Sequence, residues 1–113
     1  MKFNKNKKKR TFLTGVRNKE KIIDDGKIFL EKNEMITFET KNKSRHDVTK
    51  KDWGFYATQS INSRLKKKFK TALVSNLQNR IYIMMVEKIK MNLFKKYCKL
   101  EKQKVLIWLD EFE

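Results

Sequence analysis

The longest unbroken apolar run in the chain is Ile81–Val86. A transmembrane helix needs about 20 apolar residues, so this run is far too short to cross a bilayer. A run that is apolar on both faces is typical of a strand covered on both sides by protein. The sequence therefore predicts a sheet with Ile81–Val86 as a central strand, and residues 105–109 predict a second buried strand.

Short strands separated by turn signals fill the first half of the chain. Residues 21–23 and 27–30 flank the tripeptide Asp24-Asp25-Gly26. Because Asp-Gly supplies the positive φ of a tight turn, these residues predict an N-terminal β-hairpin. After a polar turn at residues 32–34, apolar and polar side chains alternate over residues 35–39, which predicts a half-exposed strand.

Two later segments have the apolar spacing of helices. The first covers about residues 60–69, where apolar residues recur every four positions, and the second covers about residues 88–103. The apolar stripe of the second segment contains Ile89, Leu93, Tyr97 and Leu100, with Phe94 at its flank. A helix between two buried strands permits a crossover that makes part of the sheet parallel.

These elements predict an α+β fold with one small domain, a mixed sheet, an N-terminal β-hairpin or meander, and two helices. Six of residues 1–10 are Lys or Arg and none is acidic, so residues 1–11 are predicted to form a flexible basic tail. The domain is then expected to span residues 12–113. The chain has no Pro, and no linker or internal repeat divides this region.

The charge of the chain is strongly positive. There are 29 Lys and Arg against 13 Asp and Glu, a net charge of +16, which predicts attraction to nucleic acid, anionic lipid or acidic proteins. However, 24 of the 29 basic residues are Lys, and Arg is the residue that two-pronged recognition of phosphates and bases favours. Abundant Lys, Asn and Ile also suit an AT-rich genome, so codon composition explains part of the charge.

A functional role for this charge remains an open alternative. On that hypothesis the chain is a basic RNA- or ribosome-associated protein, and its binding follows the electrostatics of phosphate contacts. The nucleic-acid-binding residues would be Lys7, Lys8, Lys9, Arg10, Lys66, Lys67 and Lys68.

The densest group of chemically useful side chains lies between residues 46 and 64. Two aromatic residues beside a Gly, followed by hydroxyl and amide side chains at the start of a predicted helix, suit a small pocket for an anion or a sugar. The candidate ligand-binding residues are Trp53, Tyr56, Thr58, Ser60, Asn62 and Arg64. The alternative is structural, with the aromatic rings in the core and Thr58 or Ser60 as a helix cap.

Catalytic and metal-binding patterns are weak in this sequence. His46 and Asp47 are adjacent, so on an extended chain they point to opposite faces and do not form a base with its orienting acid. One His and one Cys give no zinc-site spacing, so neither a metal nor a cofactor is expected. The single Cys98 suits a reducing cytoplasm, and we expect a non-enzymatic cytoplasmic protein.

Several sequence blocks resemble a family of small bacterial proteins of unassigned activity, found in gene neighbourhoods for surface polysaccharide synthesis. The pattern Trp-Gly-x-Tyr-Ala-Thr, then Ser-x-Asn-x-Arg-Leu, falls on Trp53–Thr58 and Ser60–Leu65. The chain also shares the closing Trp-Leu-Asp-Glu at residues 108–111, and the similarity covers most of the chain after about residue 20. Gln59 departs from the pattern, in which Pro is expected.

The resemblance implies an accessory role near glycan assembly and identifies no catalytic residue. Combined with the candidate site, it predicts a protein that binds a phosphorylated sugar, a nucleotide-sugar or a partner enzyme of polysaccharide biosynthesis.

Overall fold

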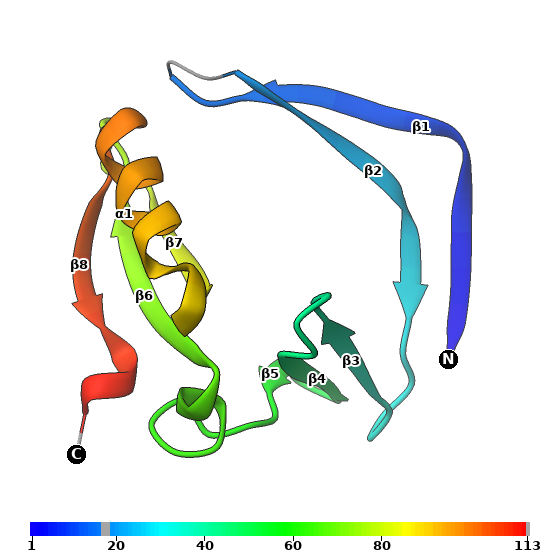
Figure 1. Ribbon diagram of the computed structural model, residues 1–113. Helices are drawn as coiled ribbons and strands as arrows, with labels where there is room; N and C mark the ends of the chain where they lie inside the picture. Colours follow the sequence, from blue (N-terminus) through cyan, green and yellow to red (C-terminus); the bar gives the residue numbers. More distant parts are fainter. Residues whose placement is uncertain (17–18, 113) are drawn as a thin grey trace.

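Eight strands and one α-helix make up the computed structural model, which describes residues 1–16 and 19–112 (Figure 1). The strands form three separate sheets, ordered β1-β2, β3-β4-β5 and β7-β6-β8, and every hydrogen-bonded pair among the described residues is antiparallel. The strands are β1 (Lys2–Thr14), β2 (Glu20–Phe29), β3 (Met35–Glu39), β4 (Arg45–Lys51), β5 (Gly54–Ala57), β6 (Phe69–Ser75), β7 (Ile81–Glu87) and β8 (Lys104–Trp108). The helix is α1 (Met91–Leu100), and short 3-10 turns form η1 (Leu65–Lys67), η2 (Lys88–Lys90) and η3 (Leu109–Glu111).

Strands β1 and β2 pair with each other as a long ribbon. Residues 1–11 do not form the predicted flexible tail, because Lys2–Thr14 is a strand paired along β2. The predicted hairpin within residues 21–30 is wrong, since Glu20–Phe29 is one continuous strand. Asp24-Asp25-Gly26 instead lies opposite a bulge in β1. Gly26 pairs with Lys5 and Asp24 pairs with Arg10, so β1 has more residues between these two pairs than β2 has.

Gly26 is required at this bulge by close packing of the two backbones. A Cβ atom at this position would lie 2.4 Å from the backbone oxygen of Asn4 and 2.9 Å from Cα of Lys5. The Asp-Gly pair is therefore a sequence signal for a bulge, which sequence reasoning took for a turn.

The middle sheet is a meander of three short strands. Strand β3 has the predicted bounds, and its residues pair from Met35 with Thr49 to Glu39 with Arg45. Asn33, with φ of 66°, forms the turn before it, as the polar turn signal predicted.

Strand β6 is the central strand of the C-terminal sheet. It pairs with β7 on one side and β8 on the other, and its Ala72 and Val74 are completely buried. The prediction that Ile81–Val86 is the central, covered strand is wrong, because β7 lies at the sheet edge and Ile83 is exposed. Strands β7 and β8 run in the same direction, and α1 connects them. They do not pair with each other, because β6 lies between them and is antiparallel to both.

Only one of the two predicted helices is present among the described residues. The second prediction, at about 88–103, is confirmed in its middle by α1, which follows η2. The first, at about 60–69, is wrong: this stretch forms η1 and then enters β6 at Phe69. Leu65 and Phe69 are both buried, Leu65 in η1 and Phe69 in β6. Their spacing of four therefore reflects two separate core positions and not one face of a helix.

The closing Trp-Leu-Asp-Glu block anchors the chain to β6. Asp110 is fully buried, and its Oδ1 accepts a hydrogen bond of 2.9 Å from the backbone N–H of Thr71. Lys70 pairs with Oδ2 of Asp110 at 3.4 Å and with Oε1 of Glu111 at 3.1 Å, and its ammonium lies 4.9 Å from the Trp108 ring centroid. Hydrogen bonding to Glu111 is the main cause that raises the pKa of Lys70.

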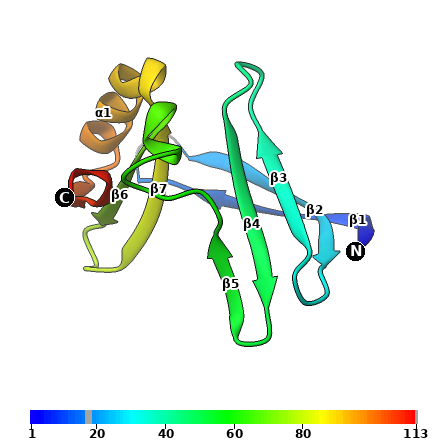
Figure 2. The ribbon, with the colours of Figure 1, turned by 90° about the horizontal axis from the view of Figure 1, so that it is seen from below.

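The three sheets surround an open centre. In Figures 1 and 2 the β1–β2 ribbon arches from the end of the C-terminal sheet towards the meander. The core is correspondingly small: only Leu65, Phe69, Ala72, Val74 and Val86 are buried apolar residues among those described. Among the described residues, 25 large apolar side chains are exposed, so the fold leaves much of its apolar surface uncovered.

Candidate functional site

The aromatic residues of the predicted ligand site lie on the outside of the meander. Trp53 occupies the turn between β4 and β5 and is 73% exposed, and its ring centroid lies 6.1 Å from that of Tyr56. The alternative prediction of a core role for these rings is wrong, since Phe55 and Tyr56 are exposed as well.

The polar residues of the predicted site make hydrogen bonds within the fold. The hydroxyls of Thr58 and Thr49 lie 2.5 Å apart, and Oγ of Ser60 accepts a bond of 3.1 Å from the backbone N–H of Arg64. The side-chain amide of Asn62 donates to the backbone oxygen of Phe112 at 3.3 Å. These contacts hold the loop after β5 in place.

A concave surface that sequence reasoning missed lies elsewhere, around the open centre. One hollow of about 520 Å³ is lined by residues of β7, α1 and the start of β6, and a second of about 460 Å³ is lined by residues of β3, β4 and β7. They share Phe69 and Met85, so they adjoin each other. A third of about 480 Å³ shares Met84 and Tyr97 with the first and reaches Ile22 of the ribbon.

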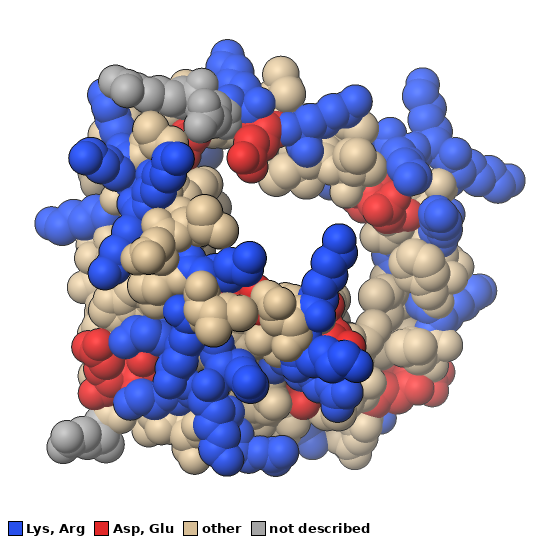
Figure 3. Space-filling model, viewed as in Figure 1, with Lys and Arg blue, Asp and Glu red and all other residues tan. Residues whose placement is uncertain are grey.

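We call the lining of these three adjoining hollows the inner surface. Figure 3 shows the hollow at the centre of the molecule, with uncharged residues over much of its wall and both basic and acidic side chains at its margin. Its apolar lining residues are Val16, Ile22, Phe38, Phe69, Leu77, Tyr82, Met84, Met85, Val86, Leu93, Phe94 and Tyr97. None of the hollows that form the inner surface is lined by a residue between 53 and 64.

Helix α1 contributes an unpartnered apolar stripe to the inner surface. Phe94 packs against Trp108 of β8, with ring centroids 5.9 Å apart, and this contact fixes the helix on the sheet. Leu93 and Tyr97 both line the hollow, and Leu93 is 62% exposed. None of the residues of α1 is buried. The stripe predicted from the sequence is therefore real, but it faces open space.

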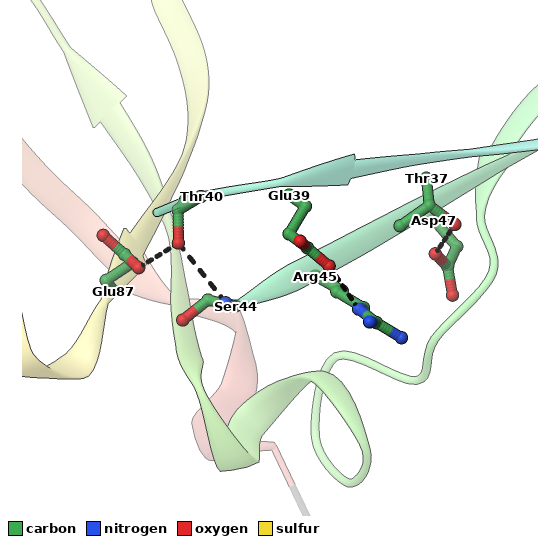
Figure 4. A network of polar contacts seen from close by, with 7 residues as sticks. All are labelled: Thr37, Glu39, Thr40, Ser44, Arg45, Asp47 and Glu87. Atoms are coloured by element: carbon green, nitrogen blue, oxygen red, sulfur yellow. Dashed lines mark hydrogen bonds and ion pairs between the residues drawn. The ribbon is translucent and has the colours of Figure 1, made fainter. Parts of the chain in front are cut away.

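Polar contacts join the meander to the C-terminal sheet at the rim of the inner surface (Figure 4). The hydroxyl of Thr40 donates to Oε1 of Glu87 at 2.6 Å and accepts a bond of 3.3 Å from the backbone N–H of Ser44. The bond from Thr40 is the main cause that lowers the pKa of Glu87. Figure 4 also shows the pair between Arg45 and Glu39 that crosses the meander.

His46 lies on the inner surface beside Phe38. Their rings are stacked, with centroids 6.3 Å apart, and Nδ1 of the imidazole is buried with no hydrogen-bond partner among the described residues. Burial lowers the pKa of His46, and the charge of Asp47 opposes that shift in part. The imidazole is therefore favoured in its neutral form, which adds a further weakly polar group to an apolar wall.

The positive charge of the described residues is mostly unpaired. Seven ion pairs are present there, and they use only five Lys or Arg side chains: Lys9, Arg10, Lys32, Arg45 and Lys70. The residues proposed for nucleic-acid contact are split between two places: Lys7–Arg10 belong to β1 and Lys66–Lys68 to η1 and the residue after it. Of these, Lys9 and Arg10 pair with Asp25 and Asp24.

Other chemical features are few. Burial raises the pKa of the Cys98 thiol, which disfavours the reactive thiolate. Within residues 1–16 and 19–112, no group of three His, Cys, Asp or Glu side chains is placed to hold a metal ion. Among the helices described, none is both long enough and apolar enough to cross a membrane.

Comparisons with known proteins found no match for this chain among protein-family models, curated proteins or solved structures.

Proposed function

We propose that this protein is a non-enzymatic accessory protein that binds another macromolecule through its inner surface. Of the targets expected from the sequence, this favours a partner enzyme over a small phosphorylated sugar or nucleotide-sugar. The resemblance to polysaccharide-locus proteins suggests that the partner works in cytoplasmic glycan assembly.

The unpartnered apolar inner surface is the observation that carries the proposal. Apolar side chains that are exposed together in one patch mark sites of association, whereas apolar side chains exposed singly are ordinary on a protein surface. Here Leu93, Tyr97 and Met85 line the same hollow and all remain exposed. Full burial of an exposed side chain of this kind contributes about 1.5–3 kcal/mol. These three side chains are 37–62% exposed, so covering each contributes only part of that energy, and several together favour association.

A small-ligand role for residues 53–64 has less support. A small-molecule site normally encloses most of its ligand, whereas Trp53 projects from a turn. Asn62 and Ser60 already use polar atoms in contacts with the chain itself. The exposed Trp53 and Tyr56 rings remain available for a second contact with the same partner.

The experiment is purification of the tagged chain from its own host, beside two variants. Leu93→Gln removes an apolar side chain from the inner surface, and Leu106→Gln removes an exposed one from β8, which lines none of the hollows. We expect one stoichiometric partner with the wild-type chain and with Leu106→Gln, and loss of that partner with Leu93→Gln. Equal recovery with both variants would refute a role for the inner surface.

RNA binding is a second candidate, favoured by the uncompensated lysines. Lys66, Lys67 and Lys68 follow one another at η1 and make no ion pair with a described acid. Phosphate contacts of this kind predict an affinity whose logarithm falls linearly with the logarithm of salt concentration. Titration of the chain with single-stranded RNA at several salt concentrations tests it, and binding unaffected by neutralising all three lysines would exclude this site.

A further inference from the structure

We infer that the partner presents an extended apolar segment, which pairs with strand β7 and adds a fourth strand to the three-stranded C-terminal sheet. This inference rests on the proposed function and names the kind of contact made at the inner surface. It follows from the open backbone edge of β7, from the lack of charge along that edge, and from the position of the edge beside the hollows.

Strand β7 has an unpaired edge. It lies at one end of the sheet order β7-β6-β8, and it pairs only with β6. Among the described residues, Ile81–Val86 make no other hydrogen bond between backbone groups. In an edge strand, alternate N–H and C=O groups point away from the sheet and are free to pair with another chain. A partner that satisfies such a row of groups must be extended, since a helix uses its own backbone groups internally.

The edge of β7 lacks the features with which proteins protect exposed strands. Such strands are normally short, or they carry Lys residues or a bulge. Strands β3, β5 and β8 have five residues or fewer, and β1 and β2 contain several charged residues. By contrast, β7 has seven residues, only its last residue is charged, and its register with β6 has no shift. Of the described strands, β7 is therefore the one best suited to accept another strand.

The edge of β7 also borders the inner surface. Figures 1 and 2 show β7 on the side of its sheet that faces the open centre, and each of the three hollows is lined by a residue of β7. Side chains alternate along a strand, so Met84 and Met85 lie on opposite faces of the sheet. Met84 shares a hollow with Tyr97 of α1, and Met85 shares one with Phe38 of β3. An added strand would meet apolar side chains on both faces, which favours a segment that is apolar throughout.

The charges around the hollows favour an uncharged segment. The charged residues that line the three hollows are Glu39, Glu87, Glu101 and Lys90. None of them lies within Ile81–Val86, so neither sign of charge is available along the apolar part of β7. A second copy of this chain is disfavoured as the occupant, because each copy carries a net charge of +16 and like net charges oppose association.

The test uses the full chain and three fluorescent peptides with the sequence Thr-Val-Ile-Val-Ile-Val-Ile-Thr. The first is unmodified, the second is N-methylated at its three Val residues, and the third is N-methylated at all Val and Ile residues. Because N–H groups alternate along an extended peptide, the second peptide keeps one edge open for pairing, and the third has both edges blocked. Fluorescence anisotropy gives the affinity of each peptide.

Two matched variants locate the contact on the protein. Ile83→Lys and Leu106→Lys each add one Lys at an exposed position, the first on the edge strand β7 and the second on the opposite edge strand β8. Amide hydrogen exchange of the wild-type chain with and without the unmodified peptide reports whether β7 gains backbone hydrogen bonds. Sedimentation equilibrium of the wild-type chain alone reports whether copies associate.

We expect the unmodified peptide and the peptide with one open edge to bind, and amide exchange in β7 to become slower. Blocking both edges should weaken binding at least roughly tenfold, because the backbone hydrogen bonds are lost. Ile83→Lys should weaken binding by a similar factor, about tenfold, because a charged side chain protects a strand edge, and Leu106→Lys should leave it nearly unchanged.

Loss of binding when only one edge is methylated would indicate a helical ligand, and equal binding of all three peptides would indicate side-chain contact alone. Either result would overturn the inference while leaving the proposed function in place. No binding of the unmodified peptide, a larger loss with Leu106→Lys than with Ile83→Lys, or a dimer of the chain alone that Ile83→Lys dissociates would also overturn it. Failure of the proposed function would appear separately, as equal recovery of the host partner with Leu93→Gln and Leu106→Gln.

Discussion

Removal of the Asp110 carboxylate should destabilise the C-terminal sheet more than any exposed substitution. Asp110 is completely buried and accepts the backbone N–H of Thr71 at 2.9 Å. In Asp110→Ala that buried N–H has no acceptor, which costs about 1–3 kcal/mol, and hydrogen bonds to charged groups lie at the upper end of this range. Lys70 keeps its contact with Glu111 at 3.1 Å, so the larger cost of an isolated buried cation does not arise.

We therefore expect Asp110→Ala to lower the free energy of unfolding by about 2–3 kcal/mol. For a domain of this length that corresponds to a fall in Tm of roughly 8–12 °C. Asp110→Asn keeps an oxygen near Thr71 but loses the charge, so it should cost about 1 kcal/mol. Glu111→Ala removes only an exposed ion pair and should cost less than about 1 kcal/mol.

Urea unfolding in a Trp53→Phe background provides the assay. The chain has two tryptophans, Trp53 on the meander and Trp108 on β8, so this background leaves Trp108 to report on the C-terminal sheet alone. The reasoning is refuted if Asp110→Ala and Glu111→Ala shift the unfolding midpoint equally, because burial of the carboxylate would then make no difference.

Three further predictions concern the rim of the inner surface and the ribbon. Burial lowers the pKa of His46 below 6.5, so as the pH falls the unfolded chain takes up a proton before the folded chain does, and the free energy of unfolding should decrease from about pH 6.5 down to the lowered pKa. Urea titrations at several pH values should show this decrease. The same decrease in His46→Gln would contradict the assignment to His46. Thr40→Val should raise the pKa of Glu87 towards 4.5, because the hydroxyl that lowers it is lost, and an NMR titration with an unchanged value would exclude that cause. Gly26→Ala should destabilise the ribbon by about 1–3 kcal/mol, because the new Cβ would overlap the backbone oxygen of Asn4; unchanged amide exchange in β1 and β2 would show that the bulge adapts.

Local patterns in the sequence predicted the elements that depend on local contacts. Residues 35–39 alternate, and they form β3 with those bounds. The polar turn predicted at residues 32–34 is confirmed, because Asn33 has a φ of 66° in the turn before β3. Apolar spacing around Leu93 correctly predicted a helix at α1.

Elements that depend on distant pairing were not predictable in this way. Phe69 continues an apolar spacing of four from Leu65, yet it pairs with Glu87 in a sheet. The basic residues of β1 lack apolar periodicity, but pairing with β2 makes them a strand. In both cases partners far along the chain decide the local structure.

The candidate site was missed for a related reason. Its lining residues come from β2, β3, β4, β6, β7 and α1, and nothing local in the sequence brings these elements together. The single available signal was the apolar stripe through Leu93 and Tyr97, from which the sequence predicted a helix but not a binding surface. The aromatic segment at Trp53 attracted attention through its composition, although it lies on an exposed turn.

The position of β6 between β7 and β8 dictates an order of assembly. The β6–β7 hairpin closes through a short turn, whereas the contact of Ala72 with Trp108 must close a much longer loop, so the hairpin should form first. Until β8 docks, one edge of β6 carries open backbone hydrogen-bonding groups beside the apolar Val74. Nascent or C-terminally shortened chains would therefore be the species most prone to aggregate, and a chaperone that shields this edge would protect them.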